Sequence, residues 1–158
     1  MQCDWRGVFP AVTTQFDSAL EIDEAAIARH LEVLIDSGVT GLVMNGSLGE
    51  NNALRPEEKR RVVKLAVEVA AGRVPVLSGV SELNTAAACE YVRDVEALGA
   101  AGVMVLPAMA YPADPAEAMH HFRTVAGACN LPIILYNNPI AYPVDITPSM
   151  FQQLANEP

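Results

Sequence analysis

Short runs of apolar residues alternate along the chain with longer stretches in which apolar positions recur every three or four residues. The runs start about 30 residues apart, which is the length of one strand-and-helix unit. They are rich in β-branched residues and apolar on both faces, as in strands of a buried parallel sheet. The pattern predicts five such strands, over residues 7–14, 41–46, 74–80, 102–107 and 132–139.

The stretches between these runs predict amphipathic helices with recognisable ends. Ile27, Leu31 and Leu34 repeat with helical spacing, and Asp23 precedes them as an N-cap. Further helices are expected to begin at Pro56, at Asn84 or Thr85, at Asp114-Pro115 and at Thr147-Pro148. A succession of βα units predicts an α/β fold, which is either an open doubly wound sheet or a (β/α)8 TIM barrel.

Composition and charge narrow the class of protein. The chain has 158 residues, of which 51% are hydrophobic, and this predicts one globular domain. Its 10 basic and 19 acidic residues argue against nucleic acid as a partner. Three cysteines without a CxxC pair indicate reduced thiols and a cytoplasmic location. Because no apolar run approaches the roughly 18 residues of a membrane span, no membrane partner is expected.

The loops after the predicted strands hold the candidate chemistry, because ligands of parallel α/β proteins bind at the carboxyl ends of strands. In the segment 46–50, GSLGE, two glycines flank a hydroxyl, so backbone N–H groups can face a small anion. An ordinary glycine turn explains this segment equally well. In 136–139, YNNP, Tyr136 can shuttle protons or can simply pack at the sheet edge.

Other polar residues are expected to be structural. His120 and His121 are neighbours on a predicted helix and point in different directions, so no metal site and no cofactor are expected. The charged run at 57–61 is interpreted as a solvated helix face. Lys59 and Lys64 are the two lysines, and both lie inside that helix, so neither is expected to form a Schiff base.

Three motifs together resemble the dihydrodipicolinate synthase/N-acetylneuraminate lyase family of class I aldolases. They are GVFPAVTTQFD at residues 7–17, GSLGE and YNNP, and they keep the order and spacing of the family. The resemblance implies a TIM barrel, with residues 1–158 as the N-terminal part of a single domain that holds about its first five βα units. It also implies a homotetramer without a cofactor.

The resemblance further implies a lyase that forms a Schiff base with pyruvate or a related 2-oxo acid. The family's lysine lies on the sixth strand, which would follow Pro158. Ser47 and Tyr136 match the two residues that relay protons, and Ser47 also helps to bind the substrate carboxylate. The other substrate-binding residues expected from the resemblance are Gly46, Leu48 through its backbone N–H, Thr13 and Asn138.

Two departures from the lysine-pathway synthase indicate a catabolic branch. The loop after the fourth run reads Ala108-Met109 where the synthase has a tyrosine, and Tyr111 comes later. The segment after YNNP reads Ile140-Ala141-Tyr142 and lacks the arginine that binds a substrate carboxylate in the synthase. The expected substrate is therefore a sugar- or hydroxyproline-derived 2-oxo acid, which undergoes aldol cleavage, dehydration or deamination.

Two other hypotheses stay open. The first is a noncatalytic fragment or binding module, because the Schiff-base lysine is not among these residues. The second is an open-sheet protein that binds a phosphorylated ligand, although no Lys or Arg lies beside GSLGE to pair with phosphate. The 158-residue chain alone is expected to be inactive and to associate, since uncovered apolar strand faces drive association. The faces in question carry Val103, Val105, Ile133 and Leu135.

Overall fold

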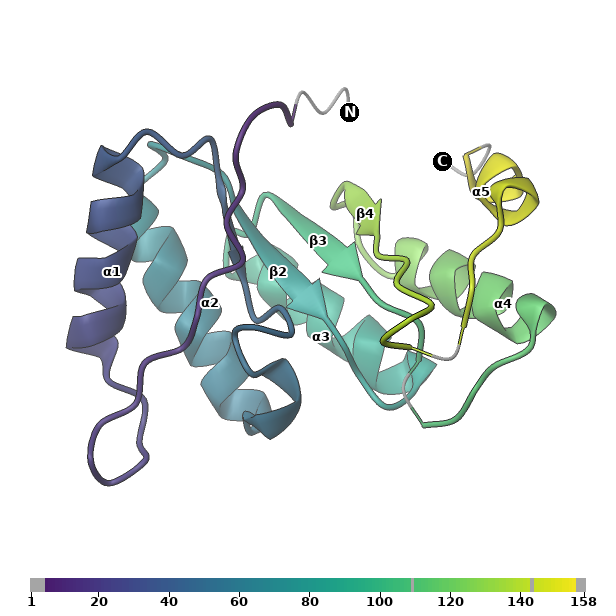
Figure 1. The fold of residues 1–158 in the computed structure, drawn as a ribbon, viewed down its shortest axis with the longest axis horizontal. Helices are drawn as coiled ribbons and strands as arrows, with labels where there is room; N and C mark the ends of the chain where they lie inside the picture. The colour runs from purple at the N-terminus through teal and green to yellow at the C-terminus, as the bar shows by residue number, and fades with distance from the viewer. Residues whose placement is uncertain (1–4, 109, 143, 156–158) are drawn as a thin grey trace.

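The fold alternates parallel strands with helices, as the hydrophobic pattern predicts. The computed structural model describes residues 5–108, 110–142 and 144–155. The strands are β1 (Leu42–Met44), β2 (Val76–Val80), β3 (Gly102–Val105) and β4 (Ile133–Leu135) (Figure 1). The helices are α1 (Glu24–Asp36), α2 (Pro56–Ala70), α3 (Thr85–Ala97), α4 (Pro115–Ala126) and α5 (Pro148–Leu154), and a short 3-10 helix, η1 (Asn51–Ala53), follows β1.

The strands lie side by side in the order in which they occur in the chain. The pairs β1–β2, β2–β3 and β3–β4 are all parallel, and in Figure 1 α3 lies behind β2 and β3. A doubly wound sheet reverses its strand order at a switch point, whereas a TIM barrel winds in one direction. The order from β1 to β4 is that of a barrel, so the open-sheet hypothesis is wrong.

The first predicted strand is an extended segment that pairs only briefly. Ala11 forms an isolated parallel bridge with Val43. The N–H of Val12 donates to the carbonyl of Val43 at 2.9 Å, and the N–H of Val43 donates to the carbonyl of Pro10 at 3.0 Å. Pro10 has no N–H, so the ladder cannot continue through it. The segment nevertheless lies beside β1 as the first member of the parallel array.

The predicted helix starts are confirmed. The side chains of Asp23, Asn84 and Asp114 accept N–H groups in the first turns of α1, α3 and α4. In α4, Glu117 accepts the N–H of Asp114 at 3.1 Å, which completes a capping box. A cap of this kind contributes about 1 kcal/mol, so these side chains fix where each helix begins after its loop.

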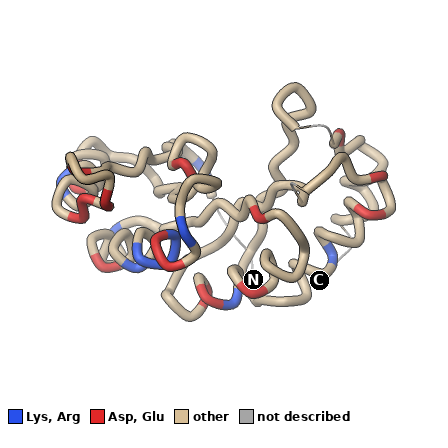
Figure 2. Tube along the Cα trace, turned by 90° about the horizontal axis from the view of Figure 1, so that it is seen from below, with Lys and Arg blue, Asp and Glu red and all other residues tan. Residues whose placement is uncertain are grey.

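Charged residues lie mostly on the helices, where acidic and basic residues are interspersed (Figure 2). Arg60 of α2 donates to Asp94 of α3 at 2.7 Å, and Arg73 donates to Glu32 of α1 at 2.8 Å. The first ion pair connects α2 to α3, and the second connects the segment after α2 to α1. Among the helices described, none combines the length and apolar character needed to cross a bilayer.

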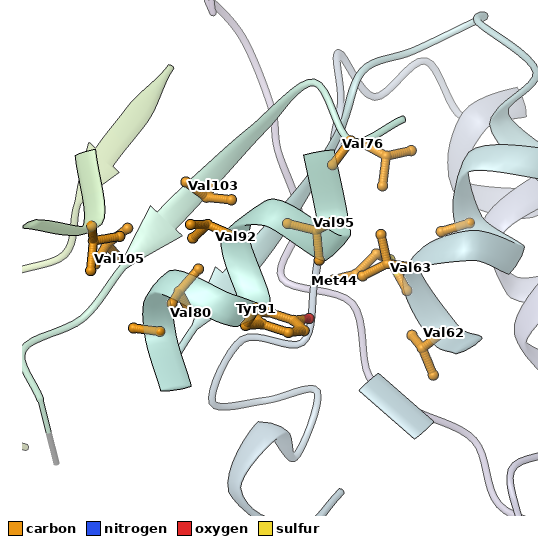
Figure 3. Close-up of a cluster of buried hydrophobic side chains, with 14 of the residues drawn as sticks. Met44, Val62, Val63, Val76, Val80, Tyr91, Val92, Val95, Val103 and Val105 are labelled. Atoms are coloured by element: carbon orange, nitrogen blue, oxygen red, sulfur yellow. The ribbon is translucent and has the colours of Figure 1, made fainter. Parts of the chain in front are cut away.

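The core lies between the sheet and the helices. Figure 3 shows buried side chains of the strands against those of α2 and α3. Val103 and Val105 are fully buried in this layer. The expectation that these two residues belong to an uncovered strand face is therefore wrong. Side chains alternate along a strand, so Met104 points to the opposite face and is partly exposed.

The sheet is least covered beside β4. An open cavity of about 840 Å³ lies between β4, α4 and α5. Ile133 and Leu135 line it and are only partly buried, in agreement with the expectation for these two residues. Phe151 of α5 lines the other side and is partly exposed.

Lys59 does not lie on a solvated face of α2, and the prediction for it is wrong. Its side chain is 8% exposed, and its Nζ contacts Oε1 of Glu82 at 2.7 Å. Lys59 precedes Val62, Val63 and Ala66 by three, four and seven residues, so it lies on the same buried side of the helix. The other lysine, Lys64, is 63% exposed, as expected.

Candidate active site

The first part of the candidate site is the turn that follows β1. Asn45 has a left-handed backbone with φ of 51°, which bends the chain sharply after the strand. The N–H of Gly49 donates to the carbonyl of Gly46 at 3.0 Å and closes the turn. Thr14 donates its hydroxyl to the carbonyl of Gly49 at 2.7 Å. The turn is therefore attached to the extended N-terminal segment.

A buried polar network supports this turn from below. The Asn45 side-chain amide donates to the carbonyl of Lys59 at 2.9 Å and to the hydroxyl of Tyr91 at 2.8 Å. Ser78 of β2 forms a 2.8 Å hydrogen bond with the same phenol, and burial raises the pKa of Tyr91 to about 12. Beside Ser78, a Cβ on Gly79 would lie 2.3 Å from the carbonyl oxygen of Asn45, so β2 approaches the turn as only glycine permits.

Ser47 and Leu48 lie at the tip of the turn, and both side chains are exposed. Among the hydrogen bonds between described residues, none has the N–H of Ser47 or Leu48 as its donor. Two adjacent N–H groups and one hydroxyl at a turn can bind a small anion such as a carboxylate. Carboxylate binding by the GSLGE segment stays a prediction.

The second part of the site is the loop that follows β4. The N–H of Tyr136 donates to the carbonyl of Val105 at 2.9 Å and extends the ladder between β3 and β4. Asn138 donates its amide to the Tyr136 hydroxyl at 3.1 Å. Asn137 donates to the carbonyl of Ile146 and accepts the N–H of the same residue at 3.0 Å. The two asparagines thus hold the loop and the phenol in one conformation.

Tyr142 connects the two parts of the site. Its hydroxyl lies 2.7 Å from Oγ of Ser47, across 95 residues of sequence. Its ring contacts that of Tyr136 edge to face, with the ring centroids 6.1 Å apart. Tyr142 therefore connects Ser47 and Tyr136, the predicted catalytic pair. From the sequence, Tyr142 has no predicted role beyond its place in the segment that lacks the arginine of the synthase. A phenol a few residues after YNNP is the signal that could have indicated it.

Thr13 stands apart from these contacts in the structure. Its side chain is exposed, and its hydroxyl accepts a hydrogen bond from Gln15 at 2.8 Å. The neighbouring Thr14 is the threonine that binds the turn after β1. Because consecutive residues of an extended segment point to opposite sides, only one of the two threonines can face the turn.

No metal centre is present among the described residues, in which no three His, Cys, Asp or Glu side chains gather. His121 packs inside the protein, where its Nε2 lies 3.1 Å from the carbonyl of Leu106. Tyr111 donates its hydroxyl to Glu117 at 3.1 Å, and this bond raises the pKa of the phenol. Met109 lies outside the described residues.

The sequence of this chain matches a known protein family. Residues 4–158 match the sequence profile described as the Dihydrodipicolinate synthetase family. The chain belongs to this family. Two curated relatives are an uncharacterized DapA-like lyase of Rhizobium meliloti, 37% identical over 98% of this chain, and a 4-hydroxy-tetrahydrodipicolinate synthase of Phenylobacterium zucineum, 40% identical over 98%. The chain spans 51% and 52% of their lengths, or about half.

Solved structures of the dihydrodipicolinate synthetase family share this fold. YagE, a prophage protein of Escherichia coli K12 crystallised in complex with pyruvate, superposes with a TM-score of 0.91 at 32% identity. The superposition covers 95% of this chain and 50% of that protein. The parallel sheet and its helices are therefore the first βα units of a (β/α)8 barrel.

Proposed function

We propose that the protein containing this chain is a Schiff-base-forming lyase that acts on pyruvate or a related 2-oxo acid. The observation that carries the proposal is the 2.7 Å contact between Ser47 and Tyr142, beside Tyr136, in a chain of this family. The similarity to YagE, which was crystallised with pyruvate, supports the substrate class. A homo-oligomer as the working form is part of the proposal and follows only from the resemblance of the sequence motifs to the family.

In this proposal the turn after β1 binds the substrate carboxylate, and the tyrosine after β4 moves protons. The N–H groups of Ser47 and Leu48 donate to the carboxylate, and Gly46 belongs to the turn that presents them. Thr14, rather than the predicted Thr13, anchors that turn through its bond to Gly49. Asn138 donates to the Tyr136 oxygen, which leaves the phenol's own proton free for transfer. When a lysine condenses with the keto group, water leaves and protons must move, and this phenol supplies and removes them.

The lysine itself is proposed to lie in the half of the relatives' length that this chain does not span. Lys59 is held by Glu82 beneath the turn, and Lys64 is exposed on the outer helix α2. Neither lysine extends from a strand end of the barrel. Residues 1–158 alone would therefore bind a carboxylate without turnover. The hypothesis of a noncatalytic fragment thus describes these residues taken by themselves.

A catabolic role is proposed over the lysine-pathway reaction. The segments 45–51 and 136–146 contain no Lys, Arg or His, and they carry Glu50 and Asp145. A second carboxylate on the substrate would therefore meet no cation from these loops. A 2-oxo acid with a single carboxylate suits this charge distribution best.

The first test is trapping of a covalent intermediate. The full-length protein that contains this chain is incubated with pyruvate and borohydride, and its intact mass is measured. We expect the mass of one reduced pyruvate adduct on a lysine outside residues 1–158. Absence of an adduct would support the noncatalytic binding module instead.

The second test concerns Tyr136. Tyr136→Phe is expected to lower kcat by roughly 10²–10⁴-fold with little change in KM, because general acid–base help acts in the transition state. Tyr111→Phe is the matched control, since that phenol contacts Glu117 on α4 and should leave kcat unchanged. An unchanged kcat for Tyr136→Phe would assign the ring to packing.

A further inference from the structure

We infer that Tyr142 is a specificity-determining residue, whose hydroxyl pairs with that of Ser47 to recognise an uncharged hydroxyl group on the substrate. The inference rests on the proposed function and adds the chemical class of the substituent next to the reacting 2-oxo acid. It starts from the contact between the two hydroxyls, which lie 2.7 Å apart.

The position of Tyr142 is fixed by its own loop. Its N–H donates to the carbonyl of Asn138 at 2.9 Å, and the N–H of Ala141 donates to the same oxygen at 3.0 Å. The edge-to-face contact with Tyr136 holds the ring from the other side. The phenol is thus directed at Ser47 by the backbone turn and by a second aromatic ring, and it is half-buried.

Two adjacent hydroxyls offer a ligand both a donor and an acceptor. Each hydroxyl has one proton and two lone pairs, so the bond between Ser47 and Tyr142 leaves one proton and several lone pairs unused. A substrate alcohol can use both kinds of group. A carboxylate can only accept, and a methyl group can do neither.

The acidic residues of the two loops also favour a substrate alcohol over a second substrate carboxylate. Glu50 is exposed in the turn that holds Ser47, and Asp145 is exposed in the loop that holds Tyr142. Asp145 accepts one hydrogen bond from Asn137 at 3.1 Å and is otherwise exposed to solvent. Since neither segment carries a cation, a distal carboxylate is disfavoured by repulsion, while an alcohol is unaffected.

The test uses three five-carbon 2-oxo acids on the full-length protein: 4-hydroxy-2-oxopentanoate, 2-oxopentanoate and 2-oxoglutarate. The readout is the concentration of each that gives half-maximal borohydride modification, counted over all adducts. In the wild-type protein we expect the half-maximal concentration of the hydroxylated acid to be about 10-fold lower than that of either other acid. One or two hydrogen bonds give a difference of this size.

Tyr142→Phe keeps the ring and removes the hydroxyl. In this variant the half-maximal concentration of the hydroxylated acid should lie within about 3-fold of that of 2-oxopentanoate. Ile140→Ala is the matched control in the same loop, because Ile140 is 99% exposed, and it should keep the wild-type ratio. The inference would be overturned if Tyr142→Phe kept the wild-type ratio of half-maximal concentrations, or if it raised the half-maximal concentrations of all three acids equally.

Pyruvate separates the two proposals. If pyruvate gives no adduct with the wild-type protein, the proposed function fails, and this inference fails with it. If pyruvate is trapped while the wild-type protein shows no preference for the hydroxylated acid, only the role of Tyr142 is wrong.

Discussion

Two neighbouring histidines of α4 illustrate how different the environments of adjacent residues can be. His120 is exposed, whereas His121 is 3% exposed. The carbonyl of Leu106 can only accept, so Nε2 of His121 carries the hydrogen and Nδ1 accepts from the Thr85 hydroxyl at 3.0 Å. Burial lowers the pKa of His121 below its ordinary value, because it disfavours the charged form of the ring.

The free energy of unfolding is therefore expected to fall as the pH drops below about 6.5, the ordinary histidine value. Below that pH the unfolded chain binds a proton that the folded state does not, until the pH passes the lowered pKa of His121. Urea unfolding at a series of pH values measures the effect. His121→Asn should flatten the dependence and His120→Asn should preserve it, and equal slopes in both variants would contradict the assignment.

At this scale the sequence indicated the chemistry of single loops but not their contacts. The positions of Ser47 and Tyr136 in loops after strands could be predicted, because each belongs to a local motif that follows an apolar run. The contact between Ser47 and Tyr142 could not, because it spans 95 residues and depends on how two loops meet at the end of the sheet. His121 was correctly interpreted as structural, since one helix cannot direct two adjacent rings at one metal.

Among the elements, α2 has two lysines with opposite surroundings. Lys59 is buried against Glu82, and its Nζ lies 5.9 Å from the centre of the Tyr91 ring. Lys64 contacts Glu68 at 3.9 Å on the exposed side. A buried ion pair adds little to the free energy of unfolding, but removal of one partner lowers that free energy strongly, because the other charge stays buried and unpaired.

Lys59→Ala is expected to lower the free energy of unfolding by about 3 kcal/mol, because it leaves the Glu82 carboxylate, itself only 16% exposed, without a cation. Lys64→Ala is the control on the same helix and should change it by less than about 0.5 kcal/mol. Chemical denaturation of both variants provides the comparison. A Lys59→Ala protein as stable as Lys64→Ala would mean that the buried pair contributes nothing.

Element boundaries were predictable where a single residue determines them. Asp23, Asn84 and Asp114 cap their helices as expected, because a cap is a local hydrogen bond. The segment at 7–14 was predicted as a full strand, but Pro10 removes a donor and leaves a single bridge. The charged run at 57–61 predicts a solvated face, but Lys59 lies in register with Val62 and Ala66 on the buried side of α2.

For the whole molecule, the uncovered side beside β4 has a direct consequence. A polypeptide limited to these 158 residues is expected to associate in solution, because the cavity at β4 is lined by partly exposed apolar side chains of Ile133, Leu135 and Phe151. Sedimentation velocity over a range of concentrations measures this association. A compact monomer at all concentrations would show that the cavity side is stable in water.

The strand order also has a consequence for how the chain folds. Each strand pairs with the strand of the preceding βα unit, and the array from the N-terminal segment to β4 follows the order of the chain. Every unit after the first can therefore dock on one that has already left the ribosome, and among the described strands only the N-terminal segment has to wait for the last strand that closes a barrel. Such short-range pairing keeps contact order low for a parallel sheet, which favours growth of the sheet during synthesis from the N-terminus onward.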